Sequence, residues 1–282
     1  MLLLLPATAL AATFLLYLIV NTFWMSFHSV DEFGRMQGFT GLDNYVVLWH
    51  DPAFQGSLLR TLIWTIVTVV ITTVISLYLA VVLNERFPGR TLVRSLLMLP
   101  WSASLVITTL LWRWLAHPDF GAVNHLLHSV SITQARIDWL ANPSLSFPLM
   151  IWIAVWVSIP PTTLMLLAGL QSLLPDIFEA GALDGARGLR KFLDFTLPLL
   201  RPIFAVSILL NVIFVFNSFP IIWVLTQGGP AGATDTLVTY LYKVGFTYYE
   251  MGQAAAVSVV IFLILFVFAI VHTRLLWNDG AA

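Results

Sequence analysis

The sequence predicts an all-α integral membrane protein with six transmembrane helices. The 282-residue chain is 59% hydrophobic and only 10% charged, whereas a soluble domain carries about a quarter charged residues. Six apolar runs reach the length of about 20 residues that crosses a bilayer, and none has a charge near its centre. Because lipid cannot satisfy backbone N–H and C=O groups, such runs fold as helices.

The six predicted spans account for most of the chain. Their approximate bounds are Leu2–Phe27, Leu59–Leu83, Ser95–Ala116, Phe147–Leu170, Pro202–Leu225 and Gly252–Leu276. A cleaved signal peptide is a poor explanation of the first run, because no Lys or Arg precedes it and it continues past the small-residue stretch "ATALAA". We therefore expect residues 1–282 to form a single transmembrane domain.

The distribution of Lys and Arg predicts the orientation of the spans. With the N-terminus inside, eight of these residues lie in inner loops and five on the outer side. The bias is sharpest in the short loop "NERFPGRTLVR", where three arginines fall within nine residues. Positive residues favour the cytoplasmic side, so both termini are expected in the cytoplasm.

The outer connections contain short segments with their own structure. "FTGLDNYVVLW" and "GAVNHLLHSV" resemble short surface helices, and "TQGGPAGATD" has the composition of a glycine-rich turn. The next segment, "TLVTYLYKVGF", is amphipathic and predicts another helix lying at the membrane interface.

The connection between the fourth and fifth spans is unusually polar. "EAGALDGARGLRKFLDFTLPLLRP", residues 179–202, carries seven charges. Asp176 and Glu179 suit the amino end of a helix, and Gly185 suits its end. Since a plain connection needs only a few residues, we expect a cytoplasmic helix–turn–helix over about residues 171–201 that docks another protein. A solvated loop with ordinary caps is the alternative.

Polar residues in the fifth span form a candidate solute site. Ser207, Asn211, Phe214 and Ser218 fall at helical spacing on one face, with Asn217 beside them. Amide and hydroxyl groups can bond to a polar solute, and Phe214 offers a ring for stacking. The alternative is that the asparagines hold helices together by hydrogen bonds. Trp152 and Trp156 share one face of the fourth span, where they could stack on a sugar ring, although a packing role is favoured.

Several classes of function are disfavoured by what the chain lacks. Its net charge is −1 with no basic stripe, which argues against nucleic acid, and it has no cysteine. The pair His125 and His128 has no third ligand nearby, so no metal site is expected. No G-x-x-x-x-G-K-[ST] stretch is present, so nucleotide would have to bind another chain. A membrane enzyme would need convergent catalytic side chains, and none is evident.

The segment between the fourth and fifth spans resembles the EAA loop of bacterial ABC importer permeases of the maltose/glycerol-phosphate type. The flanking "PTTLMLLAGLQSLLPDIFEA", "FNSFPIIWVLTQGGPAGATDTLVTYLY" and "NERFPGRTLVRSLLMLPW" fit the same class. The resemblance implies the type I ABC importer permease fold and a loop gripped by a cytoplasmic ATPase. The residues it assigns to ATPase coupling are Asp176, Glu179, Ala180, Gly181, Asp184, Gly185 and Arg187.

The same resemblance implies which residues contact the solute. They are Ser158 in the fourth span, and Asn211, Phe214, Val215 and Ser218 in the fifth, with Asn217 added from the polar pattern. Maltose-type members have an asparagine where this chain has Val155 and a tyrosine where it has Pro161, which puts maltose itself in doubt. Gly181 stands where alanine is usual.

The resemblance also implies the partners. They are a second, related permease in a heterodimer, two ATPases that bind Mg-ATP, and an extracytoplasmic solute-binding protein, all at a bacterial inner membrane. This chain would hold no cofactor, and the cargo would be a neutral di- or oligosaccharide. Glycerol phosphates are also carried by the class, but the spans contain no central cation. An ion-coupled secondary transporter is the alternative, which the absence of mid-membrane carboxylates disfavours.

Overall fold

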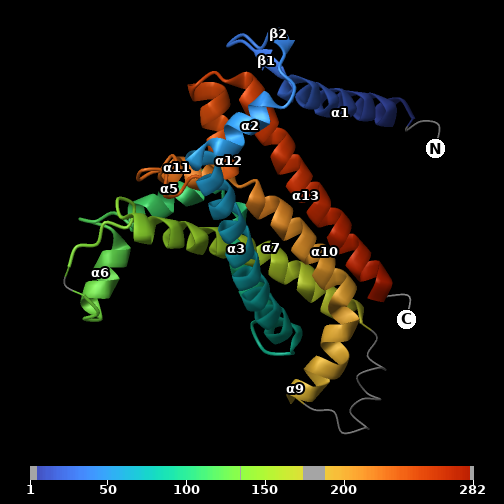
Figure 1. Cartoon of the computed structure of the whole chain (residues 1–282). Coiled ribbons are helices and arrows are strands. Elements are labelled where there is room, and N and C mark those ends of the chain that lie inside the picture. The colour runs from blue at the N-terminus through green and yellow to red at the C-terminus, as the bar shows by residue number, and fades with distance from the viewer. Residues whose placement is uncertain (1–4, 134, 174–187, 280–282) are drawn as a thin grey trace. The chain divides into compact units, whose positions relative to one another are not determined.

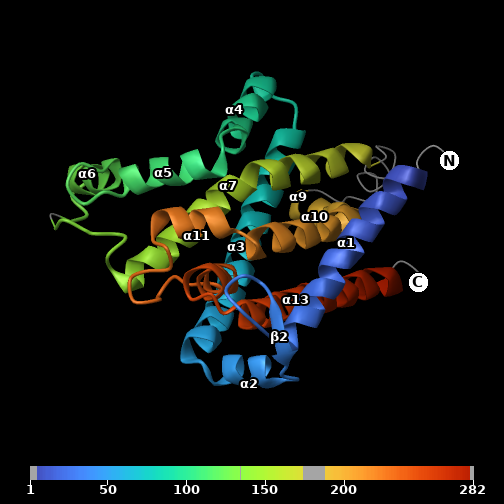
Figure 2. The ribbon, with the colours of Figure 1, turned by 90° about the horizontal axis from the view of Figure 1, so that it is seen from above.

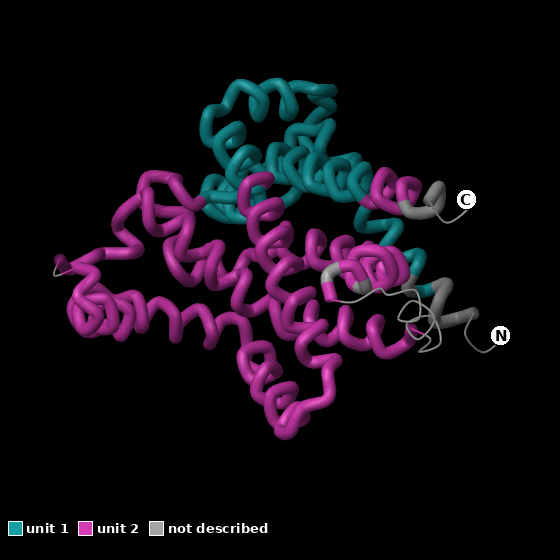
Figure 3. The backbone as a smooth tube through the Cα atoms, turned by 90° about the horizontal axis from the view of Figure 1, so that it is seen from below, with its two compact units in different colours: residues 1–61, 235–268 teal, residues 62–234, 269–282 magenta. Residues whose placement is uncertain are grey.

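The computed structural model describes residues 5–133, 135–173 and 188–279. They fall into two compact units (Figure 3). The first unit combines Met1–Thr61 with Asp235–Phe268, and the second combines Leu62–Thr234 with Ala269–Ala282. Two long helices, α3 (Pro52–Asn84) and α13 (Met251–Asp279), each contribute residues to both units.

The first unit begins with α1 (Leu5–Ser26) and a short hairpin. Strands β1 (His28–Val30) and β2 (Met36–Phe39) pair antiparallel, with His28 opposite Phe39. The predicted surface helix follows as α2 (Asp43–His50). Its Asn44 donates from Nδ2 to the carbonyls of Ser26 and His28, at 2.9 and 3.1 Å. The hairpin was not predicted.

The start of α13 approaches this hairpin through a glycine. A Cβ atom on Gly252 would lie 2.6 Å from the His28 carbonyl oxygen, so no larger residue fits without movement. Further along α13, the ring of Phe262 meets that of Phe23 edge-on, with 5.7 Å between centroids. Within the first unit, α13 therefore packs closely against the hairpin through Gly252 and against α1 through Phe262.

The predicted interfacial segment forms part of the interior of the first unit. It folds as α12 (Leu237–Tyr242) followed by a π-helical turn, Lys243–Thr247. Leu237, Thr239 and Tyr240 are buried, so one face of this helix packs inside the unit, and its place at a membrane interface stays a prediction. The amide of Leu237 donates to the Thr61 hydroxyl at 2.8 Å, and this bond ties the helix to α3.

The second unit contains the remaining helices in chain order (Figures 1 and 2). They are α4 (Arg90–Ser102), α5 (Leu105–Leu115), α6 (Ala122–Ser129), α7 (Pro143–Ser172), α9 (Gly188–Lys191), a π-helical turn (Phe192–Thr196), α10 (Leu197–Phe216) and α11 (Phe219–Leu225). The predicted surface helix "GAVNHLLHSV" corresponds to α6. α7 has the most buried apolar stretch of the candidate spans, 61% against 39% or less.

Within the described residues, four helical segments are long and apolar enough to cross a membrane. They are Pro52–Asn84, Pro143–Ser172, Phe192–Leu225 and Met251–Leu275. The pair α4 and α5 makes a fifth if a bent pair counts as one span, and α1 offers a shorter apolar helix, Ala12–Ser26. The chain is thus a helical membrane protein, and the count of six spans stays a prediction.

The third predicted span, Ser95–Ala116, was wrong as a continuous helix. α4 and α5 meet at 91°, because Ala103 and Ser104 have extended backbone. Pro100 removes one backbone donor just before the bend. The Ser102 hydroxyl donates to the Leu99 carbonyl at 2.8 Å, a local bond of the kind that competes with helix continuation.

Candidate functional site

The candidate site lies where α7 and α10 run side by side in the second unit (Figures 1 and 2). A glycine permits close contact near the carboxyl end of α7. A Cβ atom on Gly169 would lie 2.9 Å from both Cδ1 and Cγ2 of Ile203, and 3.2 Å from Cδ2 of Leu200. The two helices therefore approach as closely as they do because residue 169 has no side chain.

One turn of polar residues joins the two helices further along. Asn211 of α10 donates from Nδ2 to the Thr162 hydroxyl of α7 at 3.3 Å, and that hydroxyl donates to the Ser158 carbonyl at 2.7 Å. All three residues are buried. The interhelical bond that was the alternative role of Asn211 is therefore present. Its contact with a solute stays a prediction.

Several buried hydroxyls of the second unit have no hydrogen-bond partner among the described residues. They belong to Ser158 and Thr163 of α7, Ser218 after α10, and Thr65, Thr68, Thr72 and Thr73 of α3. Buried hydroxyls in helices often bond to the carbonyl four residues back, as Thr109 does at 2.7 Å. A buried hydroxyl left without a partner costs about 1–3 kcal/mol. These groups are free to bond to water or to the hydroxyls of a solute.

The fifth predicted span is interrupted at the candidate site. α10 ends at Phe216 and α11 begins at Phe219, so Ser218 is the N-cap residue of α11 rather than part of α10. Pro220 explains the break, since it has no backbone N–H to donate to the Phe216 carbonyl four residues back and suits the first turn of a new helix. The predicted span Pro202–Leu225 lies within one candidate span, Phe192–Leu225, but its helix is not continuous.

The predicted polar face is only partly buried. Ser207, Asn211, Val215 and Ser218 are buried with Ser158, whereas Phe214 and Asn217 are exposed in this chain. The spacing predicted that Phe214 shares one face with Asn211. In the structure Asn211 is buried and Phe214 is exposed. Of the six predicted solute-contact residues, the structure groups four inside the second unit and leaves two on its outer surface.

Two tryptophans next to the site behave differently. Trp156 of α7 meets Trp112 of α5 edge-on, with 5.7 Å between ring centroids and an 80° angle, which favours a packing role for it. Trp64 of α3 was missed by sequence reasoning. Its indole N–H donates to the Val215 carbonyl at 2.9 Å, directly before the break. A lone Trp within an apolar run carries no sequence signal for such a bond.

The predicted coupling residues lie outside the residues that the structure describes. This applies to Asp176, Glu179, Ala180, Gly181, Asp184, Gly185 and Arg187. The part of the predicted loop that follows is helical, from α9 through the π-helical turn into α10. Arg190 and Asp194 form an exposed ion pair there at 3.3 Å, a type of contact that contributes about 0–1 kcal/mol.

A polar network in the first unit links α12 to the amino end of α3. Asp235 accepts from the Lys243 Nζ at 2.7 and 2.9 Å, and its carbonyl accepts from Arg60 Nε at 2.8 Å. The Tyr240 hydroxyl donates to Asp51 Oδ2 at 2.5 Å. Burial raises the pKa of Tyr240 above its usual value, and the bond to Asp51 and that carboxylate's charge raise it further. These bonds connect α12 to the start of α3, and we assign the network a structural role.

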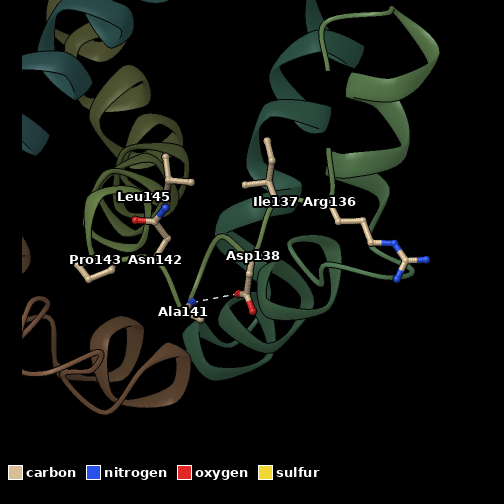
Figure 4. A pocket seen from close by; sticks show the side chains of 7 residues that line it. All are labelled: Arg136, Ile137, Asp138, Ala141, Asn142, Pro143 and Leu145. Carbon is tan, nitrogen blue, oxygen red and sulfur yellow. Dashed lines mark hydrogen bonds between the residues drawn. The ribbon is translucent and has the colours of Figure 1, made fainter. Parts of the chain in front are cut away.

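A surface pocket of about 580 Å³ lies in the loop before α7 (Figure 4). It is lined by Arg136, Ile137, Asp138, Ala141, Asn142, Pro143 and Leu145. Its polar groups already serve the loop: Asp138 accepts from two backbone amides, Arg136 pairs with Asp119 at 2.8 Å, and Asn142 caps α7. We assign it no function. The described residues also contain no cluster of His, Asp or Glu that could hold a metal ion.

Comparisons with known proteins agree with this architecture. Residues 72–276 match the protein family described as "Binding-protein-dependent transport system inner membrane component". A probable ABC transporter permease of Brucella suis is 41% identical over 97% of this chain and 94% of its own length. The trehalose/maltose transport system permease MalF of Thermococcus litoralis is 33% identical over 97% and 92%.

A solved structure shares the fold. The crystal structure of a bacterial ABC transporter involved in the import of the acidic polysaccharide alginate has a chain that superposes with a TM-score of 0.86. The match covers 98% of this chain and 94% of that one, at 23% sequence identity. At this identity the likeness shows the fold alone.

Proposed function

The chain belongs to the family of binding-protein-dependent transport system inner membrane components, and from that premise we propose that it carries a neutral di- or oligosaccharide across the bacterial inner membrane. As an ABC permease component it is a non-catalytic, multi-pass subunit. The observation that carries the choice of cargo is the α7–α10 contact. There the buried polar groups are an amide and hydroxyls, and neither α7 nor residues 202–225 contain a charged residue.

The chemistry of this contact supports an uncharged, hydroxyl-rich cargo. Asn211 offers an amide, and the unpartnered hydroxyls of Ser158 and Ser218 can each donate and accept. A phosphate ester would call for an opposing cation or oriented backbone amides, and it is the weaker candidate for that reason. The exposed side chains of Phe214 and Asn217 would face a pathway shared with a second, related permease.

In the proposed mechanism, a separate ATPase drives the pathway through the loop between α7 and α10. The charged segment around Glu179 would sit in a cleft of the ATPase, so that ATP-driven closure of an ATPase dimer moves this loop. α10 follows the loop directly through α9 and the π-helical turn, so a displacement of the loop reaches Asn211 along a single helix. An extracytoplasmic binding protein would deliver the solute on the opposite side.

The arrangement in the membrane follows from the same proposal. Six spans form one transmembrane domain with both termini in the cytoplasm, and α4 with α5 forms a bent third span. On this arrangement the arginine-rich loop between α3 and α4 is cytoplasmic. Arg94 in that region donates to the Leu83 carbonyl at 2.8 Å and so caps the end of α3.

The proposal is tested by capture of partners and by a ligand screen. Tagged wild-type chain, co-expressed with the ATPase and the second permease, should retain the ATPase, and Glu179→Lys should lose it because the charge in the docking segment is reversed. Glu85→Lys makes the same reversal in another predicted inner loop and should retain the ATPase. Equal retention by all three proteins counts against the docking role.

The cargo is tested on the binding protein. Its thermal unfolding is measured with maltose, trehalose, alginate oligosaccharides and sn-glycerol 3-phosphate. A shift by a neutral sugar supports the proposed cargo class. A shift by the phosphate ester or the acidic oligosaccharide alone overturns it.

A further inference from the structure

The break between α10 and α11 deprives several backbone carbonyls of their helical donor four residues on, and that of Val215 is one of them. In a continuous helix the Val215 carbonyl would accept from the amide of Phe219, four residues on. That amide donates instead to the Asn217 carbonyl at 2.8 Å. The Val215 carbonyl accepts from the Ser218 amide at 3.1 Å and from the Trp64 indole at 2.9 Å. The indole thus supplies from another helix a donor that the break removed.

The environment of Trp64 makes this bond well defined. The side chain has no exposed surface and belongs to the hydrophobic core of the second unit, with Met150, Ile153, Ile221 and Ile222. Its ring lies 6.3 Å from that of Phe147 at the start of α7. Trp64 therefore bonds to the helix that ends at the break and shares a buried cluster with residues of the helix that begins after it. Buried tryptophan N–H groups usually need a partner, and this one finds it at the break.

The position of the break gives the bond its functional meaning. Val215 accepts the bond, and Ser218, whose buried hydroxyl has no partner among the described residues, follows three residues later. In membrane transporters, interrupted helices place backbone and polar groups toward the solute. Irregular backbone at membrane depth is tolerated only where protein or a water-filled cavity satisfies it.

We propose that Trp64 is a positioning residue that holds the α10–α11 break and so sets where Ser218 lies in the solute pathway. The inference rests on the proposed function for the meaning of the pathway. The stabilisation of the break by Trp64 is a property of this chain alone, so it can be measured without solute or ATPase. Loss of the indole N–H should loosen the break while leaving the rest of the second unit packed.

The absence of native cysteine allows a direct test. Ser218→Cys places a thiol at a buried position and removes no hydrogen bond seen in the described residues. In the full chain held in lipid nanodiscs, the rate of labelling by a maleimide reports how often the break opens. Trp64→Phe should raise this rate roughly 2- to 10-fold, the effect of one lost hydrogen bond. Ala80→Cys, buried elsewhere in the same unit, reports general loosening and should not change.

Two further variants separate the bond from packing. Trp64→His keeps a ring nitrogen at the position that the indole nitrogen occupies in its five-membered ring. The imidazole is smaller than the Phe ring but can still donate to the Val215 carbonyl, so this variant should label like wild type. Trp112→Phe removes an indole N–H that has no partner among the described residues, and should also label like wild type. If Trp64→Phe is not recovered as folded protein, Trp64→Leu against Trp64→His makes the same comparison.

The proposal is overturned if Trp64→Phe labels no faster than Trp112→Phe. It is overturned equally if the His and Phe variants accelerate labelling alike, or if Ala80→Cys accelerates with Ser218→Cys. Failure of ATP-driven uptake in every variant would count against the proposed function and leave the labelling result standing.

Discussion

Asn211 of α10 donates a hydrogen bond from Nδ2 to the Thr162 hydroxyl of α7, at 3.3 Å and in a buried setting. This bond crosses the interface between the helices that flank the predicted coupling loop. It gives Asn211 a structural role in addition to the predicted contact with the solute, and the two roles have different consequences on mutation.

The first prediction separates these two roles. Asn211→Ala and Thr162→Val each remove the bond. A double-mutant cycle of their free energies of unfolding should give a coupling energy of about 0.6 kcal/mol, the average for interhelical hydrogen bonds in membranes. Asn211→Ala should also lower uptake per assembled complex well below that of Thr162→Val, since only the amide is expected to touch the solute. Equal uptake by the two variants would leave Asn211 with the structural role alone.

The second prediction concerns the close contact at Gly169. Gly169→Val should lower the free energy of unfolding by about 1–3 kcal/mol, because its side chain overpacks the space taken by Ile203 and Leu200. The neighbouring Ala168 is exposed, so Ala168→Val is a matched control and should change it by less than about 0.5 kcal/mol. Thermal unfolding in detergent micelles measures both, and similar losses in the two variants would argue against the tight helix contact.

The third prediction is a pH dependence at Tyr240. Because its pKa is raised in the folded protein, the native state holds the phenol proton more tightly than the unfolded state does. The stability from this group is therefore complete below the ordinary tyrosine pKa of about 10 and is lost as pH rises above it. Tyr240→Phe should be less stable than wild type by about 1.5–3 kcal/mol near neutral pH, and the difference should shrink above pH 10.

Thermal unfolding at pH 8 and at about pH 11 checks this prediction, with Tyr249→Phe on the exposed neighbouring loop as the control. The control should match wild type at both pH values. A gap between wild type and Tyr240→Phe that stays constant with pH would show that the phenol proton is not held more tightly in the folded state.

Hydropathy predicted the long spans well and their ends poorly. The predicted Leu59–Leu83 corresponds to α3, which begins at Pro52. The extra residues, 52–58, mix apolar, small and polar side chains. The helix starts there because the Asp51 side chain accepts from the Ala53 amide at 2.8 Å. Apolar content could not show this, since a cap is a local hydrogen bond between side chain and backbone.

The breaks in two spans depend on single residues and their hydrogen-bond partners, which the average hydropathy of a span does not show. Pro100 and Pro220 were visible in the sequence, but proline is also tolerated within helices, as Pro160 and Pro161 are in α7. Whether a helix breaks depends on what satisfies the freed carbonyls. At Val215 that donor is Trp64, which is 151 residues away in sequence. No local pattern predicts such a pair.

The burial of α12 shows the same limitation. Its amphipathic pattern fits either a membrane interface or the surface of a protein core. In the structure this helix is held by the ion pair of Asp235 with Lys243 and by the bond from Leu237 to Thr61, which joins segments distant in sequence. The predicted solute residues lie in α7, in α10 and in the break after α10, and their contact with a solute stays a prediction. Which of them are buried required the structure.

The central claim is that a separate ATPase drives this chain, and uptake into proteoliposomes tests it most directly. The chain and its partner permease are reconstituted with and without the ATPase. The binding protein, loaded with the solute found in the ligand screen, is added outside the proteoliposomes, and ATP is enclosed inside them. The account predicts uptake only when the ATPase is present, and none with Glu179→Lys. Uptake at the same rate without any ATPase would contradict it.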